Sequence, residues 1–128
     1  QVVKTIISAG IDVDAYNADH MTPLHLSSSV GSHRLLAYLL LYTKANIHAK
    51  TKKGYTSLHL AVVEGMEKCI RYLVICEGRD VNSPDRYGRT PLMHACRYGR
   101  KEAAHTLVMV GARIETEDIF GATAMNFA

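Results

Sequence analysis

Histidine and serine side chains occur close together in the segment TPLHLSSSVGS, residues 22–32. A histidine can act as a general base towards a nearby hydroxyl, and it is also a common metal ligand. His25 precedes the serine run at residues 27–29. Catalysis would also require an orienting carboxylate, and the pattern of the sequence offers none. The segment by itself leaves three interpretations of His25: catalytic base, metal ligand or scaffold.

The other histidines and the cysteines lack a metal-binding spacing. No HExxH or CxxC pattern occurs in the chain. The cysteine count is odd, and Cys69 and Cys76, if helical, would lie about 10 Å apart along the helix axis, too far for a disulfide. We therefore expect no metal, no cofactor, and a reducing intracellular location, cytoplasmic or nuclear. The scattered histidines are His20, His33, His48 and His105.

Length and charge restrict the class of protein. The chain has 128 residues, of which 48% are hydrophobic, enough for one domain. Its longest apolar run, residues 35–42, is shorter than the roughly 20 residues of a membrane-spanning helix, so we expect no membrane insertion. The net charge of +3 is too mild to identify a partner, and any basic surface must come from local clustering.

An internal repeat supplies the elements that position these side chains. The segments MTPLHLSSSVG, YTSLHLAVVEG and RTPLMHACRYG align without gaps, and ATAMNFA begins a fourth copy. Successive spacings of the motif threonine are 34, 34 and 33 residues. A period of this length is typical of stacked repeat units. The threonines are Thr22, Thr56, Thr90 and Thr123.

Each copy predicts two helices. Proline at the first helical position fits Pro23 and Pro91, and a glycine follows each of the first three motif threonines by nine residues. Beyond that glycine, pairs of apolar residues recur every four positions and form one stripe on a longer helix. An extended turn then leads to the next unit. The stripes are Val2, Val3, Ile6, Ile7; Leu35, Leu36, Leu39, Leu40; Cys69, Ile70, Leu73, Val74; and Ala103, Ala104, Leu107, Val108.

The units resemble ankyrin repeats, whose pattern Gly-x-Thr-Pro-Leu-His-x-Ala is met repeatedly here. The resemblance implies an all-α ankyrin-repeat solenoid of stacked helix-turn-helix units with hairpin-like connecting loops. It divides the chain into a partial repeat at 1–16, repeats at 17–50, 51–84 and 85–116, and a partial repeat at 117–128. Because terminal units normally carry polar caps, we expect further repeats or domains in the parent chain.

The same resemblance assigns His25 and His59 to the scaffold, where they hydrogen-bond around the motif threonine. The third unit departs from the pattern, because Met93 occupies the histidine position and His94 follows it. One position turns a helical side chain by about 100°. We therefore expect His94 to face away from the scaffold network, towards the recognition surface, with simple solvent exposure as the alternative.

In ankyrin-like stacks, hairpin tips and the first helices line a concave groove, and the resemblance places a basic and aromatic patch there. Arginine and tyrosine often carry binding energy at interfaces. We expect a non-catalytic module that binds a protein segment, acidic or phosphorylated, with apolar anchors; the alternative is that these cations only solubilise the stack. The expected partner-binding residues are Lys52, Lys53, Tyr55, Arg86, Tyr87, Arg89, His94, Arg97, Tyr98 and Phe120.

Two other interpretations stay open. A basic groove with tyrosines could bind nucleic acid, although nearby carboxylates at Asp19, Glu64, Glu117 and Asp118 interrupt it. Alternatively, Asn82 in RDVNS matches the family's acceptor position for an asparaginyl hydroxylase. Hydrogen bonding of Asn82 within its own turn is the simpler explanation of that residue. No catalytic residue is expected in this chain.

Overall fold

The computed structural model of the protein describes residues 13–77 and 81–127. In these ranges all regular elements are helices. The helix expected over residues 2–7 lies outside the described residues. The helices are α2 (Pro23–Val30), α3 (His33–Tyr42), α4 (Ser57–Glu64), α5 (Glu67–Glu77), α6 (Pro91–Arg97), α7 (Lys101–Met109) and α8 (Ala124–Phe127).

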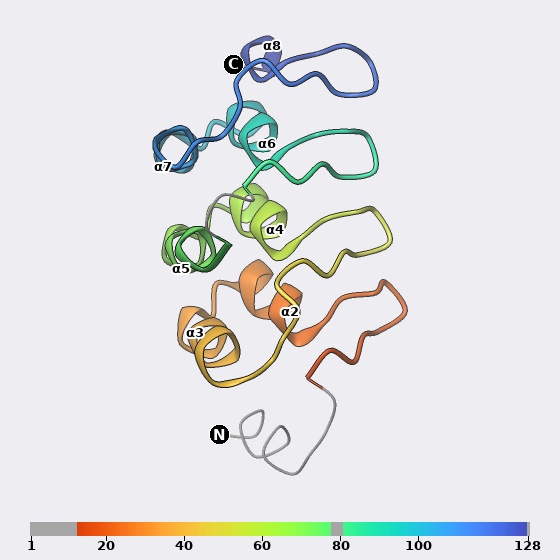
Figure 1. Ribbon diagram of the computed structural model, residues 1–128, viewed down its shortest axis with the longest axis vertical. Helices are drawn as coiled ribbons and strands as arrows, with labels where there is room; N and C mark the ends of the chain where they lie inside the picture. The colour runs from red at the N-terminus through yellow and green to blue at the C-terminus, as the bar shows by residue number, and fades with distance from the viewer. Residues whose placement is uncertain (1–12, 78–80, 128) are drawn as a thin grey trace.

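The helices form a stack of antiparallel pairs (Figure 1). Inner helices α2, α4, α6 and α8 follow one another in one column, and each contacts the next. Outer helices α3, α5 and α7 form a second column beside them. Long loops project from the side of the inner column away from the outer helices. The arrangement is the all-α solenoid that the resemblance to ankyrin repeats implied, and that prediction is confirmed.

The inner helices begin at the motif threonines. The Thr22 side chain accepts a hydrogen bond from the backbone N–H of His25, and Thr56 caps α4 in the same way through His59. Such caps satisfy N–H groups that have no partner inside the helix. Gly31 and Gly65 then end α2 and α4 with positive φ values of 79° and 69°, a conformation that favours glycine.

The hairpin-like loops close in the same way at each tip. A backbone N–H at the start of the tip donates to a carbonyl four residues later, as between Thr51 and Tyr55 and between Asp85 and Arg89. Gly54, two residues before its motif threonine, has φ 79°, and His20 takes the same phase with φ 59°. A left-handed backbone at a non-glycine residue costs of order 1 kcal/mol, so the tip at His20 carries strain.

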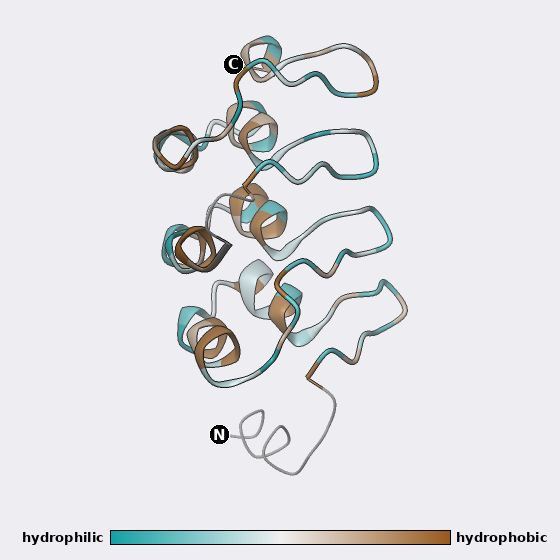
Figure 2. Ribbon diagram, viewed as in Figure 1, coloured by the Kyte–Doolittle hydropathy of each residue, from teal (hydrophilic) through white to brown (hydrophobic). Residues whose placement is uncertain are grey.

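Apolar side chains meet between neighbouring helix pairs. Leu24, Leu58 and Leu92 occupy the same position of three successive units and are 1%, 1% and 3% exposed. Figure 2 shows brown mainly on the helices, while much of the loop backbone is teal or pale. These leucines belong to one core cluster shared by successive helix pairs, so burial holds the stack together unit by unit.

Replacing Leu58 with alanine should lower the free energy of unfolding by about 2–5 kcal/mol, because it removes buried methylenes and leaves a cavity between units. Urea unfolding followed by circular dichroism measures the loss. The replacement of the exposed Leu41 is the control and should change stability little. An unchanged urea midpoint for Leu58→Ala would contradict the placement of this leucine between units.

Candidate functional site

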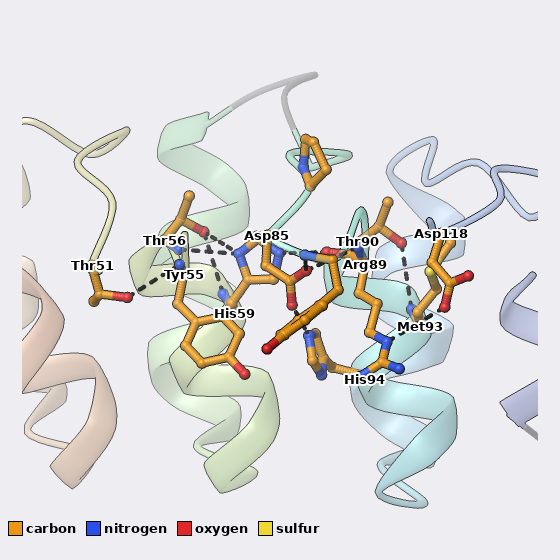
Figure 3. Close-up of polar contacts among 12 residues, drawn as sticks. Thr51, Tyr55, Thr56, His59, Asp85, Arg89, Thr90, Met93, His94 and Asp118 are labelled. Atoms are coloured by element: carbon orange, nitrogen blue, oxygen red, sulfur yellow. Dashed lines mark hydrogen bonds and ion pairs between the residues drawn. The ribbon is translucent and has the colours of Figure 1, made fainter. Parts of the chain in front are cut away.

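His25 and His59 connect the helix caps to the chain that follows. The Nδ1 atom of His59 accepts from the backbone N–H of Thr56 at 3.1 Å, and its Nε2 atom donates to the carbonyl of Arg89 at 3.0 Å (Figure 3). His25 bonds the Thr22 N–H and the Ala49 carbonyl in the same manner. With both nitrogens engaged and the side chains buried, neither ring is free to serve as a general base. Both histidines are scaffold.

Burial keeps these histidines neutral. Desolvation lowers the pKa of His59 from 6.5 to about 4, and the Arg89 carbonyl offsets only part of this effect. Desolvation also lowers the pKa of His25. At the corresponding position in α8, Asn126 replaces histidine, and its side-chain oxygen accepts from the N–H of Thr123 at 2.7 Å. An amide therefore makes the cap bond without the ring.

His94 differs from the expectation, since its side chain is buried and only 2% exposed. It does leave the cap network, where Met93 takes the buried place. The turn of the helix, however, points His94 at the tip loop, and its Nε2 lies 2.8 Å from the Asp85 carboxylate (Figure 3). The expectation of solvent exposure is wrong because Asp85 offers a buried acceptor at this place.

The His94 ring also supports the aromatic residues of the expected patch. Its centroid lies 5.6 Å from Tyr55 and 6.2 Å from Tyr98. Desolvation lowers the pKa of His94, while the bond to Asp85 acts in the opposite direction. Its Nδ1 atom is buried without a hydrogen-bond partner among the described residues. His94 therefore holds two tyrosines in position rather than presenting itself to a partner.

The sequence reasoning missed the polar residues that shape the tips. The Asp85 Oδ1 atom accepts from the backbone N–H groups of Tyr87 and Arg89, at 2.8 and 3.0 Å. Asp118 repeats this arrangement one unit later, with the N–H groups of Phe120 and Ala122. A periodic signal was present, because an oxygen-bearing side chain occurs five residues before every motif threonine. These residues are Asn17, Thr51, Asp85 and Asp118.

The cations of the expected patch separate into two groups. Arg89 is held inside the structure, with Nε 3.4 Å from Asp118 and its guanidinium near the rings of Tyr87 and Phe127. Hydrogen bonds, first that from the Ala122 N–H, lower the pKa of Asp118, which stays a carboxylate opposite Arg89. A second group has exposed side chains and no ion pair within the described part of the chain. We call these the unpaired cations: Lys52, Lys53, Arg86 and Arg97.

Several of the expected residues line one open cavity of about 500 Å³ at the loop tips, which we call the tip cavity. Lys52, Lys53, Tyr55 and Arg86 contribute to its wall. Arg97 lies outside this lining, with its guanidinium 5.7 Å from the ring centre of Tyr98, yet its charge acts on the Tyr55 phenol. Tyr87, on the loop before α6, and Phe120, on the loop before α8, are exposed and do not line the cavity.

The remaining candidates for chemistry have structural explanations. Ser27 and Ser28 donate to the Leu24 carbonyl at 3.0 and 2.8 Å and so bond back to their own helix. Burial raises the pKa of the thiols of Cys69 and Cys96, which disfavours the reactive thiolate. Among the described residues no group of three potential ligands could hold a metal ion.

The turn residue Asn82 makes a bond between units. Its side-chain oxygen accepts from the backbone N–H of Arg113 at 2.8 Å. Asp14 makes the corresponding bond to the N–H of Asn46 two units earlier. The Asn82 side chain thus links successive turns, and its bonding within its own turn, which includes residues 78–80 outside the described ranges, stays a prediction. Hydroxylation of Asn82 stays a prediction.

The outer helices carry a second exposed surface. Leu41, Ile75 and Met109 are 64%, 78% and 72% exposed and occupy the same position of α3, α5 and α7, 34 residues apart. We call these three residues the outer apolar row. Exposed apolar surface can mark an interaction site, so this row competes with the tip cavity as a place of binding.

The fold defines a class: a solenoid of stacked helix pairs with an apolar core, in which buried polar side chains hold the helix starts and the loops in place. A family model described as ankyrin repeats, in three copies, matches residues 1–85. A second, described as ankyrin repeat, matches residues 87–116. The chain belongs to the ankyrin repeat family, whose repeats are in general protein–protein interaction modules.

One relative illustrates where such repeats occur. The potassium channel SKOR of Arabidopsis thaliana is 41% identical over 54 residues, which is 42% of this chain and 6% of the channel. The chain thus spans only a small part of that relative's length. None of the helices in the described ranges has the length and apolar character needed to cross a membrane.

The stability of the protein should fall as the pH drops from about 6.5 to about 4. In this window the unfolded chain binds a proton at His59 that the folded chain excludes, which costs the fold about 3 kcal/mol at the acid end. The lowered pKa values of His25 and His94 act in the same direction. Urea unfolding at pH 7.5 and pH 4.5 measures the difference.

His59→Asn is the matched variant, because Asn126 shows that an amide can make the cap bond. It should lose about 1 kcal/mol at pH 7.5, since the Arg89 carbonyl loses the His59 donor and keeps only the Asp85 N–H. It should also lose less stability than the wild type on acidification. An equal pH dependence in both proteins would rule out His59 as a source of the effect.

Asp85→Ala should destabilise the protein by about 2–4 kcal/mol, because two backbone N–H groups and the His94 ring lose their acceptor. Asp85→Asn should be milder. It keeps the oxygen that binds the backbone, and His94 can move its proton to the unpartnered Nδ1 and accept from the new amide. Urea unfolding compares the two, and equal losses would contradict this account of the tip.

Proposed function

We propose that this chain is a non-catalytic binding module that captures an extended protein segment carrying acidic or phosphorylated residues beside apolar ones. The observation that carries the proposal is the set of unpaired cations beside the tip cavity. Lys52, Lys53 and Arg86 line that cavity together with apolar side chains, and none of the three forms an ion pair with a described carboxylate. Charged groups without a partner favour ligands of opposite charge, and arginine can hold a carboxylate or phosphate through two hydrogen bonds.

The fixed geometry of the tips supports the same proposal. Asp85 holds the backbone of Tyr87 and Arg89, and the N–H of Arg86 donates to the Lys53 carbonyl at 3.0 Å. The loops that carry the cations are therefore joined to each other. Binding to a preorganised surface loses little conformational entropy on the protein side.

Nucleic acid is a weaker candidate. Phosphates could follow the same cations, but Asp19 lines the cavity that they surround. A binder of nucleic acid needs a continuous basic surface to contact successive phosphates. The charge pattern suits a short acidic stretch better than a long polyanion.

A selection of random peptides displayed on phage, with this chain as bait, should enrich sequences that combine aspartate or glutamate with an apolar residue. Replacing Lys52, Arg86 and Arg97 with glutamine should weaken binding of the best synthetic peptide by about tenfold, since exposed charge pairs contribute up to about 1 kcal/mol each. Fluorescence anisotropy at two salt concentrations measures the affinity.

The matched control replaces Arg34, Lys68 and Arg71 with glutamine, which removes the same charge from exposed positions of the outer helices. This control should bind as the wild type does. Equal weakening by both triple variants, or loss of binding only in an Ile75→Ser variant of the outer apolar row, would contradict the proposal. Competition of the peptide by single-stranded DNA at physiological salt would instead support nucleic acid as the ligand.

A further inference from the structure

The tip cavity is formed by several loops that are joined to one another. It lies where three consecutive loops meet, and the loops are joined by backbone hydrogen bonds. The N–H of Lys52 donates to the Asp19 carbonyl at 3.2 Å, and that of Arg86 donates to the Lys53 carbonyl at 3.0 Å. The loop before α2, the loop before α4 and the loop before α6 thus form one rim.

The inside of the cavity is apolar. Met21, Tyr55 and the α4 residue Leu60 line it, and each is partly exposed. The Tyr55 ring is fixed from behind, with its centroid 5.9 Å from His59 and 5.6 Å from His94 (Figure 3). A partner side chain placed against these residues would remove apolar surface from water. The volume of about 500 Å³ admits a ring as large as phenylalanine together with adjoining backbone.

The charges on the rim are unequal along the stack. Asp19 stands on the side of α2, Lys52 and Lys53 stand in the middle, and Arg86 stands on the side of α6. Arg97, at the end of α6, adds positive charge on the side of α6. Carboxylates of a ligand are therefore attracted on one side of the cavity and repelled on the other.

From these three observations we infer that the cavity receives one aromatic or branched apolar side chain that stands at the end of an acidic run, and that Asp19 excludes segments with carboxylates on both sides of it. This inference rests on the proposed function and adds a position for the anchor and a direction for the charges. Exposed Asp19 acts here as a selectivity residue, because it disfavours one class of ligand.

Four synthetic peptides with a fluorescent label test the inference. Gly-Phe-Asp-Glu-Asp-Glu-Gly and its reversed form Gly-Glu-Asp-Glu-Asp-Phe-Gly place the anchor at the end of the acidic run, in either chain direction. Gly-Asp-Glu-Phe-Asp-Glu-Gly has the same composition with the anchor in the middle, and Gly-Gly-Asp-Glu-Asp-Glu-Gly lacks it. Anisotropy titrations at low salt give each affinity.

The better of the two end-anchored peptides should bind about tenfold more tightly than the peptide without phenylalanine, the gain expected for burying such a side chain. It should also bind several-fold more tightly than the peptide with the central anchor. Asp19→Asn should remove most of this second difference by improving the central peptide alone. The variant retains the backbone bonds of residue 19, so the tip keeps its shape.

Leu60→Gln tests the floor of the cavity. It should bring the end-anchored peptide close to the level of the peptide without phenylalanine, while Ile75→Gln on the outer apolar row should leave all affinities unchanged. Circular dichroism and urea unfolding establish that each variant folds.

Two patterns would overturn the inference. If all acidic peptides bind the wild type equally and lose affinity only in the Lys52, Arg86 and Arg97 variant, the anchor site is wrong while the proposed function stands. If end-anchored and central peptides differ equally in the wild type and in Asp19→Asn, the role of Asp19 is wrong. Absence of binding by every acidic peptide would overturn both the inference and the proposed function.

Discussion

A buried neutral histidine that bonds backward to its helix cap and forward to the next loop is the interaction on which the stack depends. His59 accepts from Thr56 and donates to Arg89, and Arg89 immediately precedes the next cap residue, Thr90. One side chain thus fixes the start of its own helix and the entry of the chain into the following one. Because the bond to Thr56 is buried, losing it leaves the Thr56 N–H without this partner, while the Arg89 carbonyl would keep its bond from the Asp85 N–H.

The unit that contains α6 lacks this histidine and joins its helix to a loop by a different hydrogen bond. Met93 fills the histidine position with apolar volume, and the cap residue Thr90 still accepts from the Met93 N–H at 3.4 Å. The histidine displaced by one position bonds Asp85, which also organises the tip that carries Arg86. The bond between His94 and Asp85 thus joins helix to tip where Met93 cannot bond to the next loop, and it brings the His94 ring against Tyr55 and Tyr98.

This arrangement explains why neighbouring cations differ in what they can do. Arg89 has a carboxylate and two aromatic rings around its guanidinium, so its charge is used within the fold. Arg100 likewise donates to the Val63 carbonyl at 2.8 Å, next to the end of α4. Lys52 and Arg86 have no such partner among the described residues and are carried by loops of fixed shape. Cations of the second kind retain their charge for a ligand, which is the basis of the proposed binding of acidic segments.

The sequence alone determined the period, the helix pairs, the burial of Leu24, Leu58 and Leu92, and the scaffold role of His25 and His59. These features depend on contacts between residues close in sequence or at a fixed repeat distance, which a periodic pattern records. The burial of His94, the engagement of Arg89 and the gathering of Asp19, Lys53 and Leu60 around one cavity were decided by the tertiary structure. Each requires the position of a side chain in one unit relative to a loop of another. Residue type and phase do not contain that information, because a cation looks the same in the sequence whether a carboxylate has folded against it or not.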